Sequence, residues 1–245
     1  MKYFELIKVA KESTNENAPH TKQQLYVIFF RMLGFYAAPF FLMLNVSANK
    51  VSFFGLLLGL ISSGLILSGY VFFGIVAYFF AVLLDHVDGV IARVNNTATF
   101  YGRFIDGFIG IIIVTLIRLS LSVLLTKNYG LNLILWFRII STILSPMHYL
   151  FFDRYSTFSR WINEEHPDKN IKPYLRGSLP VYYNKINDFQ NISLLCIPLF
   201  YNFTNIFEYF LLAYFLVNIY LAVHTIYIHT ISAYKNFVLP ANPHR

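Results

Sequence analysis

Three aspartates lie in a segment of the sequence that is otherwise strongly apolar. The segment is LLDHVDGVIARVNNTATFYGRFIDGFIG (residues 83–110), and it places Asp85, Asp88 and Asp106 among leucine, valine, isoleucine and phenylalanine. A charged side chain at the centre of a membrane helix costs about 2.5–3.5 kcal/mol on insertion scales, so such residues mark candidate functional sites. Asp85 and Asp88 are three residues apart, which puts both on one face of a helix.

The positions of the three carboxylates favour a divalent cation. If the loop 94–102 joins two spanning helices on the cytoplasmic side, Asp106 lies about one turn into the second helix, at a depth comparable to that of the other two aspartates. Carboxylate oxygens are ligands that Mg²⁺ and Mn²⁺ prefer. The three aspartates therefore predict a Mg²⁺ or Mn²⁺ site. A purely structural alternative pairs them with Arg93, Arg103 or Arg118 to hold the helices together.

The composition of the chain indicates a membrane protein. Of its 245 residues, 57% are hydrophobic and 13% are charged, whereas a soluble domain carries about 25% charged residues. Apolar runs of about 20 residues, the length that a helix needs to cross the hydrocarbon core, recur along the sequence. We expect an all-α integral membrane protein, a single domain over residues 1–245, with six transmembrane helices at 50–69, 71–93, 103–126, 130–152, 188–203 and 207–234.

The segment 25–45 precedes the six-helix core (50–234) and needs a separate interpretation. It is apolar enough to span a membrane, but Arg31 and Pro39 are expected to divide it into two shorter pieces. We expect a juxtamembrane helix that lies in the membrane interface. A seventh span is the alternative.

The distribution of Lys and Arg sets the expected orientation. The N-terminal segment 1–24, the loop at 93–103, the polar loop 153–187 and the C-terminal tail contain fourteen basic residues, whereas the opposite loops contain only Lys127. Cytoplasmic loops carry the excess of Lys and Arg, so we expect both termini in the cytoplasm, beneath a bacterial inner membrane. Anionic lipid headgroups or phosphorylated substrates, and not nucleic acid, then explain the net charge of +7.

The aspartate segment resembles the signature of the CDP-alcohol phosphotransferase (CDP-alcohol phosphatidyltransferase) family. Members carry D-x-x-D-G-x-x-A-R, eight further residues, and then G-x-x-x-D-x-x-x-D. This sequence matches every fixed position except the last, with Asp85, Asp88, Gly89, Ala92, Arg93, Gly102 and Asp106. Upstream, SANKVS (residues 47–52) is similar to the family's P-N-x-x-T motif before the first span, although Ala48 replaces the proline. The resemblance also implies six transmembrane helices preceded by a juxtamembrane helix.

By this resemblance, the protein is expected to move an alcohol phosphate from a CDP-alcohol to an acceptor, with release of CMP and with Mg²⁺ or Mn²⁺ as cofactor. The implied metal ligands are Asp85, Asp88 and Asp106. The implied nucleotide-binding residues are Asn49, Ser52, Asp85, Asp88, Gly89, Ala92, Arg93 and Gly102. The expected partners are the CDP-alcohol, an acceptor of unknown identity and membrane lipid.

Three cations of the polar loop are candidates for binding the acceptor. Arg154, Lys172 and Arg176 border the expected cytoplasmic mouth of the site, where arginine can fork onto phosphate oxygens. The same residues also satisfy the positive-inside rule, so a purely topological role is the alternative.

Glycine occupies the last position of the signature. By the resemblance, a fourth aspartate there helps to bind a second metal and deprotonates the acceptor, and Gly110 supplies neither group. Three accounts are open. Water or a histidine acts as the base, with His86, His148, His224 and His229 as candidates. Alternatively, the acceptor is already anionic. In the third account, the chain is a catalytically silent or altered homologue that binds CDP-alcohol or partners without the usual transfer.

Glycines also have a packing interpretation. Gly107 and Gly110 could form a small-residue seam that lets helices approach closely. Gly55 and Gly59 form a G-x-x-x-G motif, which also allows close helix packing. Such packing could occur within the chain or between two copies of it, so a homodimer is one possibility.

Overall fold

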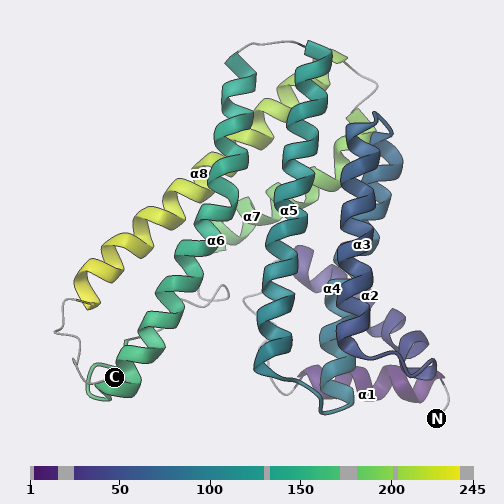
Figure 1. The fold of residues 1–245 in the computed structure, drawn as a ribbon, viewed down its shortest axis with the longest axis vertical. Helices are drawn as coiled ribbons and strands as arrows, with labels where there is room; N and C mark the ends of the chain where they lie inside the picture. The colour runs from purple at the N-terminus through teal and green to yellow at the C-terminus, as the bar shows by residue number, and fades with distance from the viewer. Residues whose placement is uncertain (1–2, 16–24, 130–132, 172–180, 201–203, 238–245) are drawn as a thin grey trace.

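Every element in the part of the chain that the structure describes is an α-helix. The computed structural model describes residues 3–15, 25–129, 133–171, 181–200 and 204–237. Figure 1 shows α3, α4 and α5 side by side, while α6 and α8 lean away from them. The helices follow one another as α1 (Tyr3–Asn15), α2 (Leu25–Met43), α3 (Ala48–Leu67), α4 (Val71–Val94), α5 (Phe100–Tyr129), α6 (Leu133–Glu165), α7 (Val181–Phe200) and α8 (Thr204–Asn236). The predicted all-α fold is confirmed.

Five segments of the described helices are long and apolar enough to cross a membrane by length and composition. They are Leu25–Met43, Ala48–Leu67, Val71–Val94, Ile105–Leu124 and Leu212–Asn236. The protein is thus an integral membrane protein with five candidate spans, and α2 is one of them. The expected spans 130–152 and 188–203, in α6 and α7, are not among the five, and residues 130–132 and 201–203 lie outside the described part of the chain.

The expected polar loop 153–187 is partly helical. α6 continues to Glu165, and α7 begins at Val181. The extension of α6 packs on α8, where the rings of Tyr155 and His229 have centroids 5.3 Å apart and Asn236 donates a hydrogen bond to the Tyr155 hydroxyl at 3.1 Å. The helix thus continues past residue 152, the expected end of the fourth span, because packing on α8 keeps the following polar segment helical.

The N-terminal segment contains an amphipathic helix, α1, that was not expected from the sequence. It buries Leu6, Ile7 and Ala10 and exposes Phe4, and it packs against α2 and α4. Figure 1 shows α1 lying across the end of the α3–α5 group at which α4 passes into α5.

α2 is one continuous helix, so the expectation that Arg31 and Pro39 divide it is wrong. Pro39 lies inside the helix, where it removes one backbone hydrogen bond. Phe35 and Ala38 pack in a buried cluster with residues of α4, Val87 among them. Burial against α4 offsets the local cost of the proline.

The first residues of α2 are bound by a side chain from far along the sequence. Asp188 of α7 accepts hydrogen bonds from the backbone N–H groups of Leu25 and Tyr26, each at 2.9 Å. The first N–H groups of a helix have no partner inside the helix, so this buried carboxylate supplies one. The contact joins α2 to α7.

Glycines of α3 face two different helices. A Cβ atom on Gly55 would lie 3.5 Å from the carbonyl oxygen of Ala81 in α4, and one on Gly59 would lie 2.6 Å from Cγ1 of Ile113 in α5. Both glycines are buried. The G-x-x-x-G motif therefore serves close packing within the chain.

Candidate active site

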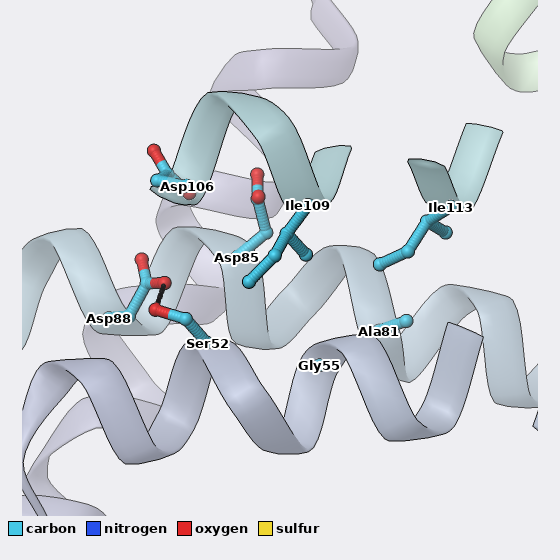
Figure 2. A pocket seen from close by; sticks show the side chains of 8 residues that line it. All are labelled: Ser52, Gly55, Ala81, Asp85, Asp88, Asp106, Ile109 and Ile113. Carbon is cyan, nitrogen blue, oxygen red and sulfur yellow. Dashed lines mark hydrogen bonds between the residues drawn. The ribbon is translucent and has the colours of Figure 1, made fainter. Parts of the chain in front are cut away.

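The three aspartates line one small pocket between α3, α4 and α5. Its lining consists of Ser52, Gly55, Ala81, Asp85, Asp88, Asp106, Ile109 and Ile113. Figure 2 shows the three carboxyl groups at one end of this space and the side chains of Ala81, Ile109 and Ile113 toward the other. The structure thus brings together residues from α4 and α5 that the sequence placed at the same depth.

Asp88 is the most enclosed of the three aspartates. Its side chain is 5% exposed, whereas Asp85 and Asp106 are half-buried. The Ser52 hydroxyl of α3 donates a hydrogen bond to Asp88 Oδ2 (Figure 2). Ser52 therefore holds one carboxylate oxygen and links the first two helices of the site.

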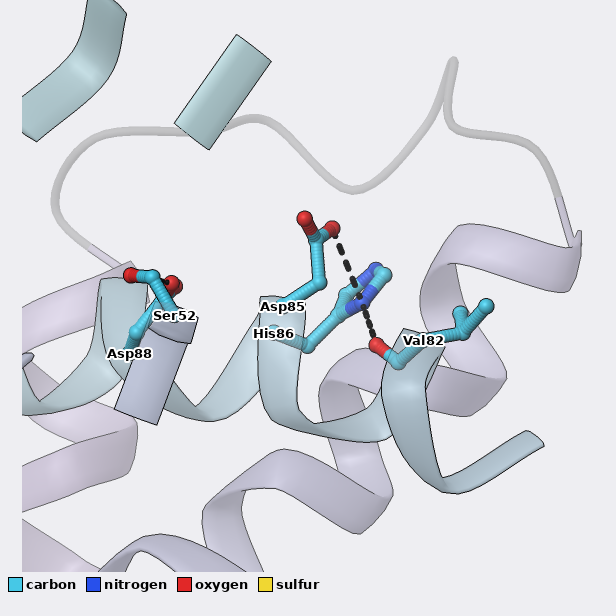
Figure 3. A network of polar contacts seen from close by, with 5 residues as sticks. All are labelled: Ser52, Val82, Asp85, His86 and Asp88. Atoms are coloured by element: carbon cyan, nitrogen blue, oxygen red, sulfur yellow. Dashed lines mark hydrogen bonds and ion pairs between the residues drawn. The ribbon is translucent and has the colours of Figure 1, made fainter. Parts of the chain in front are cut away.

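Asp85 lies beside His86, which faces away from the pocket toward α2. His86 Nδ1 is 3.0 Å from the carbonyl oxygen of Val82 and 3.8 Å from Asp85 Oδ2 (Figure 3). Because a carbonyl oxygen only accepts, Nδ1 is the protonated nitrogen. On its other side the imidazole contacts Phe30 of α2, with centroids 5.7 Å apart. His86 therefore connects α2 to the segment of α4 that carries the aspartates.

The remaining signature residues surround the pocket on the side where α4 passes into α5. The guanidinium of Arg93 lies over Gly89, because a Cβ atom on that glycine would be 3.4 and 3.5 Å from its two terminal nitrogens. The backbone N–H of Gly102 donates to Thr99 Oγ1 at 3.0 Å. A Cβ atom on Gly102 would lie 3.9 Å from Asn49 Oδ1 of α3.

Asn49 and Ala92 complete the predicted nucleotide-binding set. Asn49 is exposed, and Ala92 is half-buried one residue before Arg93. Neither residue lines the pocket, which Ser52, Asp85 and Asp88 do line.

Gly110 has open space in front of its α-carbon. Among the described residues, no atom lies within 4 Å of a Cβ atom placed on Gly110 or on Gly107. The interpretation of these two glycines as a close-packed seam is therefore wrong. Gly110 shares a helix face with Asp106 and Ile113, which are four residues before and three residues after it, and both line the pocket.

The donor chemistry of the pocket fits a hard divalent cation. Three carboxylates converge on one partly open space, and oxygen donors of this kind suit Mg²⁺ and Mn²⁺. The described residues contain no group of three His, Cys, Asp or Glu side chains already close enough together to hold a metal ion. Ser52 engages one Asp88 oxygen, so side-chain rotation would have to accompany binding.

Three of the four candidate histidines lie on α6 and α8, and none of the four is in the lining of the pocket. His229 is buried, and its Nδ1 lies 2.6 Å from the carbonyl oxygen of Thr225. His224 stacks on Tyr220, with ring centroids 5.7 Å apart. The ring of His148 is tilted against that of its neighbour Tyr149, with centroids 4.0 Å apart. Their role as a base stays a prediction.

The predicted acceptor-binding residues are only partly described. Arg154 is exposed on the α6 extension and does not line the pocket. Lys172 and Arg176 lie outside the described residues. The pocket also contains residues that the sequence did not single out, namely Ala81, Ile109 and Ile113, because apolar side chains in a membrane helix carry no local signal of a site.

Comparison with known proteins agrees with the geometry. The sequence profile of the CDP-alcohol phosphatidyltransferase family matches residues 45–229, about three quarters of the chain. No curated protein matches the sequence. The matched segment contains all three pocket aspartates and begins after α2. The chain therefore belongs to the CDP-alcohol phosphatidyltransferase family, whose members are enzymes that transfer an alcohol phosphate and release CMP.

Proposed function

We propose that this protein is a membrane CDP-alcohol phosphotransferase that depends on Mg²⁺ or Mn²⁺. The observation that carries the proposal is the convergence of Asp85, Asp88 and Asp106, all within candidate membrane spans, on one pocket, within a chain of this family. Three carboxylates together are costly in such a place unless a cation or a reaction uses them. A site for a metal-bound diphosphate supplies that use.

In the proposed reaction, an oxygen of the acceptor forms a bond to the β-phosphorus of the CDP-alcohol. The bond from this phosphorus to the bridging oxygen breaks, and CMP leaves with that oxygen. Divalent cations held by Asp85, Asp88 and Asp106 would neutralise the charge that develops on the attacking and leaving oxygens.

The residues of the chain have distinct parts in this proposal. Asp85, Asp88 and Asp106 would hold the cation. Ser52 orients Asp88 through its hydrogen bond. Arg93, whose guanidinium lies over Gly89, would contact the phosphates. Asn49 and Gly102, which lie close together across α3 and α5, would border the nucleotide.

Gly110 favours an acceptor that needs no proton removed. The described pocket contains no histidine, and its carboxylates are those assigned to the cation. We propose an acceptor whose attacking oxygen is already ionised, held at the pocket mouth by Arg154, Lys172 and Arg176. A second candidate function follows from the same glycine, because a homologue without the usual base could bind CDP-alcohol and not turn it over.

For the topology, we propose that α3 to α8 cross the membrane and that α2 lies at the cytoplasmic interface. The fourteen basic residues on one side and Lys127 on the other support this arrangement.

A screen for CMP release tests the proposed function. Purified protein with Mn²⁺ or Mg²⁺ is expected to release CMP from at least one pair of CDP-alcohol and acceptor. The Asp88→Asn variant is expected to lose this activity and to lose thermal stabilisation by CDP, because the carboxylate charge is removed. The amide oxygen can still accept the Ser52 hydrogen bond, so the fold is kept.

Two results would contradict the proposal. Stabilisation by CDP that is unchanged in Asp88→Asn would show that the nucleotide binds elsewhere. CDP binding by the wild-type protein without CMP release from any pair would favour the silent homologue.

A further inference from the structure

α2 places an arginine, Arg31, at the back of the α4 segment that carries the aspartates. Phe30, the residue before it, is fully buried and contacts the ring of His86. Gly34, about one turn further along, approaches His86 so closely that a Cβ atom there would lie 3.5 Å from the backbone carbonyl of that histidine. The side chain of Arg31 therefore starts from the seam between α2 and α4.

The position of α2 on this seam is fixed from a second direction. Six residues before Arg31, the N–H group of Leu25 donates to the carboxylate of Asp188, which is 7% exposed. Tyr26 donates to the same carboxylate. The first turn of α2 is bound to α7 and its middle packs on His86. These two contacts fix the position of the backbone at Arg31.

Arg93 reaches the same seam from α4. His86, Gly89 and Arg93 are spaced three and four residues apart, so they lie on one face of that helix. The terminal nitrogens of Arg93 lie over Gly89. Arg31 lies three residues before Gly34, so it shares the face of α2 that meets His86. Both arginines therefore lie along this seam.

Two guanidinium groups on one seam repel each other, and an anion bound between them removes that repulsion. Arginine is suited to phosphate because its planar fork can donate two parallel hydrogen bonds to phosphate oxygens. Gly89 keeps the space in front of Arg93 free of a side chain. The seam adjoins the carboxylate pocket, since Gly89 lies one turn after Asp85, which lines the pocket.

We propose that Arg31 and Arg93 together bind one phosphate group over Gly89, at the seam between α2 and α4. Arg31 lies outside the residues that match the family profile, so this cation is an addition of α2 to the site. The phosphate comes either from the diphosphate of the nucleotide or from an anionic acceptor. Assignment to either source rests on the proposed function, whereas the binding of phosphate itself does not.

Titration calorimetry on the purified full chain tests the site with three probes: CDP, cytidine and inorganic phosphate. Arg31→Gln is expected to weaken CDP binding about tenfold or more, as the loss of a hydrogen-bonded charge does, and to leave cytidine binding unchanged. Arg31→Lys keeps the charge but not the fork and is expected to lose about threefold. Lys235→Gln removes one exposed charge from the end of α8 and serves as the matched control.

The pattern of losses identifies the source of the phosphate. Weaker binding of CDP in Arg31→Gln assigns the site to the nucleotide. Unchanged CDP binding, with weaker binding of inorganic phosphate to the CDP-loaded protein, assigns it to the acceptor. Unchanged affinity for both probes overturns the proposal. If Arg31→Gln does not fold, the Lys variant decides by the same comparison.

Failure of the proposed function gives a different result. In that case the wild-type protein does not bind CDP with Mn²⁺ or Mg²⁺. Titration with inorganic phosphate alone then decides the site. Phosphate binding by the wild type that is lost in Arg31→Gln supports the phosphate site. Phosphate binding that is unchanged in Arg31→Gln, or absent from the wild type, overturns it.

Discussion

At the level of single residues, Asp88 is closely surrounded by other side chains, whereas Gly110 borders open space. Asp88 is enclosed and Ser52 engages one of its carboxylate oxygens, so this hydrogen bond would rearrange when a cation binds. Gly110 lies on the same face of α5 as Asp106, and the space that a side chain would fill is open. The position that holds a fourth aspartate in the family signature therefore borders open space beside the carboxylates of the site.

Restoring that aspartate tests what the glycine does. Gly110→Asp is expected to fold, because its Cβ atom meets nothing within 4 Å, and to bind Mn²⁺ more tightly, by about tenfold, because an oxygen donor and a negative charge are added one turn from Asp106. Electron paramagnetic resonance of free Mn²⁺ measures the affinity and the number of ions bound. Gly110→Asn, which has the same shape without the charge, is the control and is expected to bind Mn²⁺ like the wild type. Equal affinity in Gly110→Asp and Gly110→Asn would show that position 110 does not face the cation.

The activity of the same variant separates the accounts of Gly110. With an ionised acceptor, Gly110→Asp is expected to leave CMP release unchanged or lower, because the new charge repels the acceptor. A gain of about 10²–10⁴-fold, the contribution of a positioned general base, would instead show that a base was missing.

At the level of elements, glycines set the distances between α3 and its neighbours. Gly59 brings α3 against Ile113 of α5, and Gly74 of α4 brings that helix against α3, where its carbonyl oxygen accepts from Ser62 Oγ at 2.6 Å. Ile113 lines the pocket. The width of the site therefore depends on a glycine that does not carry any of its chemistry.

Gly59→Ala is expected to destabilise the protein by about 1–3 kcal/mol, the usual cost of overpacking a core, because the new methyl group would lie 2.6 Å from Cγ1 of Ile113. CDP affinity is expected to fall too, since Ile113 would be pushed into the pocket. Thermal melting in detergent measures the stability. On the same helix, Gly64→Ala is the control: its Cβ atom meets nothing within 4 Å, and removing a helical glycine contributes about 0.5–1 kcal/mol of stability. Equal melting temperatures for the two variants would mean that Ile113 moves aside at no cost.

At the level of the whole molecule, the outer surface is that of a membrane protein. Large apolar side chains such as Phe53, Phe72 and Phe73 are more than half exposed on α3 and α4. An apolar surface of this kind in water would promote aggregation, whereas lipid tails solvate it. The charged groups of the aspartate pocket face inward between α3, α4 and α5, as polar groups at membrane depth do.

Accessibility of introduced cysteines tests the proposed orientation. In a Cys196→Ser background, Ser68→Cys lies between α3 and α4, and Thr97→Cys lies between α4 and α5; both positions are exposed. A maleimide that cannot cross membranes is expected to label Ser68→Cys in intact cells and Thr97→Cys only after the membrane is opened, because the basic segments are cytoplasmic. Labelling in the reverse order would invert the topology and place the aspartate pocket at the outer face.

The sequence by itself determined the class of the protein and the chemistry of its site. Apolar runs predicted the helices, because the length of a span and the hydropathy of a segment are local properties. The spacing of Asp85, Asp88 and Asp106 predicted their convergence, because helical periodicity and a short connection leave them little freedom. The family signature is equally local.

Only the tertiary structure decided how the helices are joined and what each glycine does. The bond from Asp188 to the start of α2 connects residues more than 160 positions apart, and the burial of α2 on α4 keeps it continuous through Pro39. The same kind of packing extends α6 past residue 152, closes α3 on Ile113 at Gly59, and leaves open space at Gly110. A local pattern does not contain these facts, because each depends on which surface a distant segment of the chain covers.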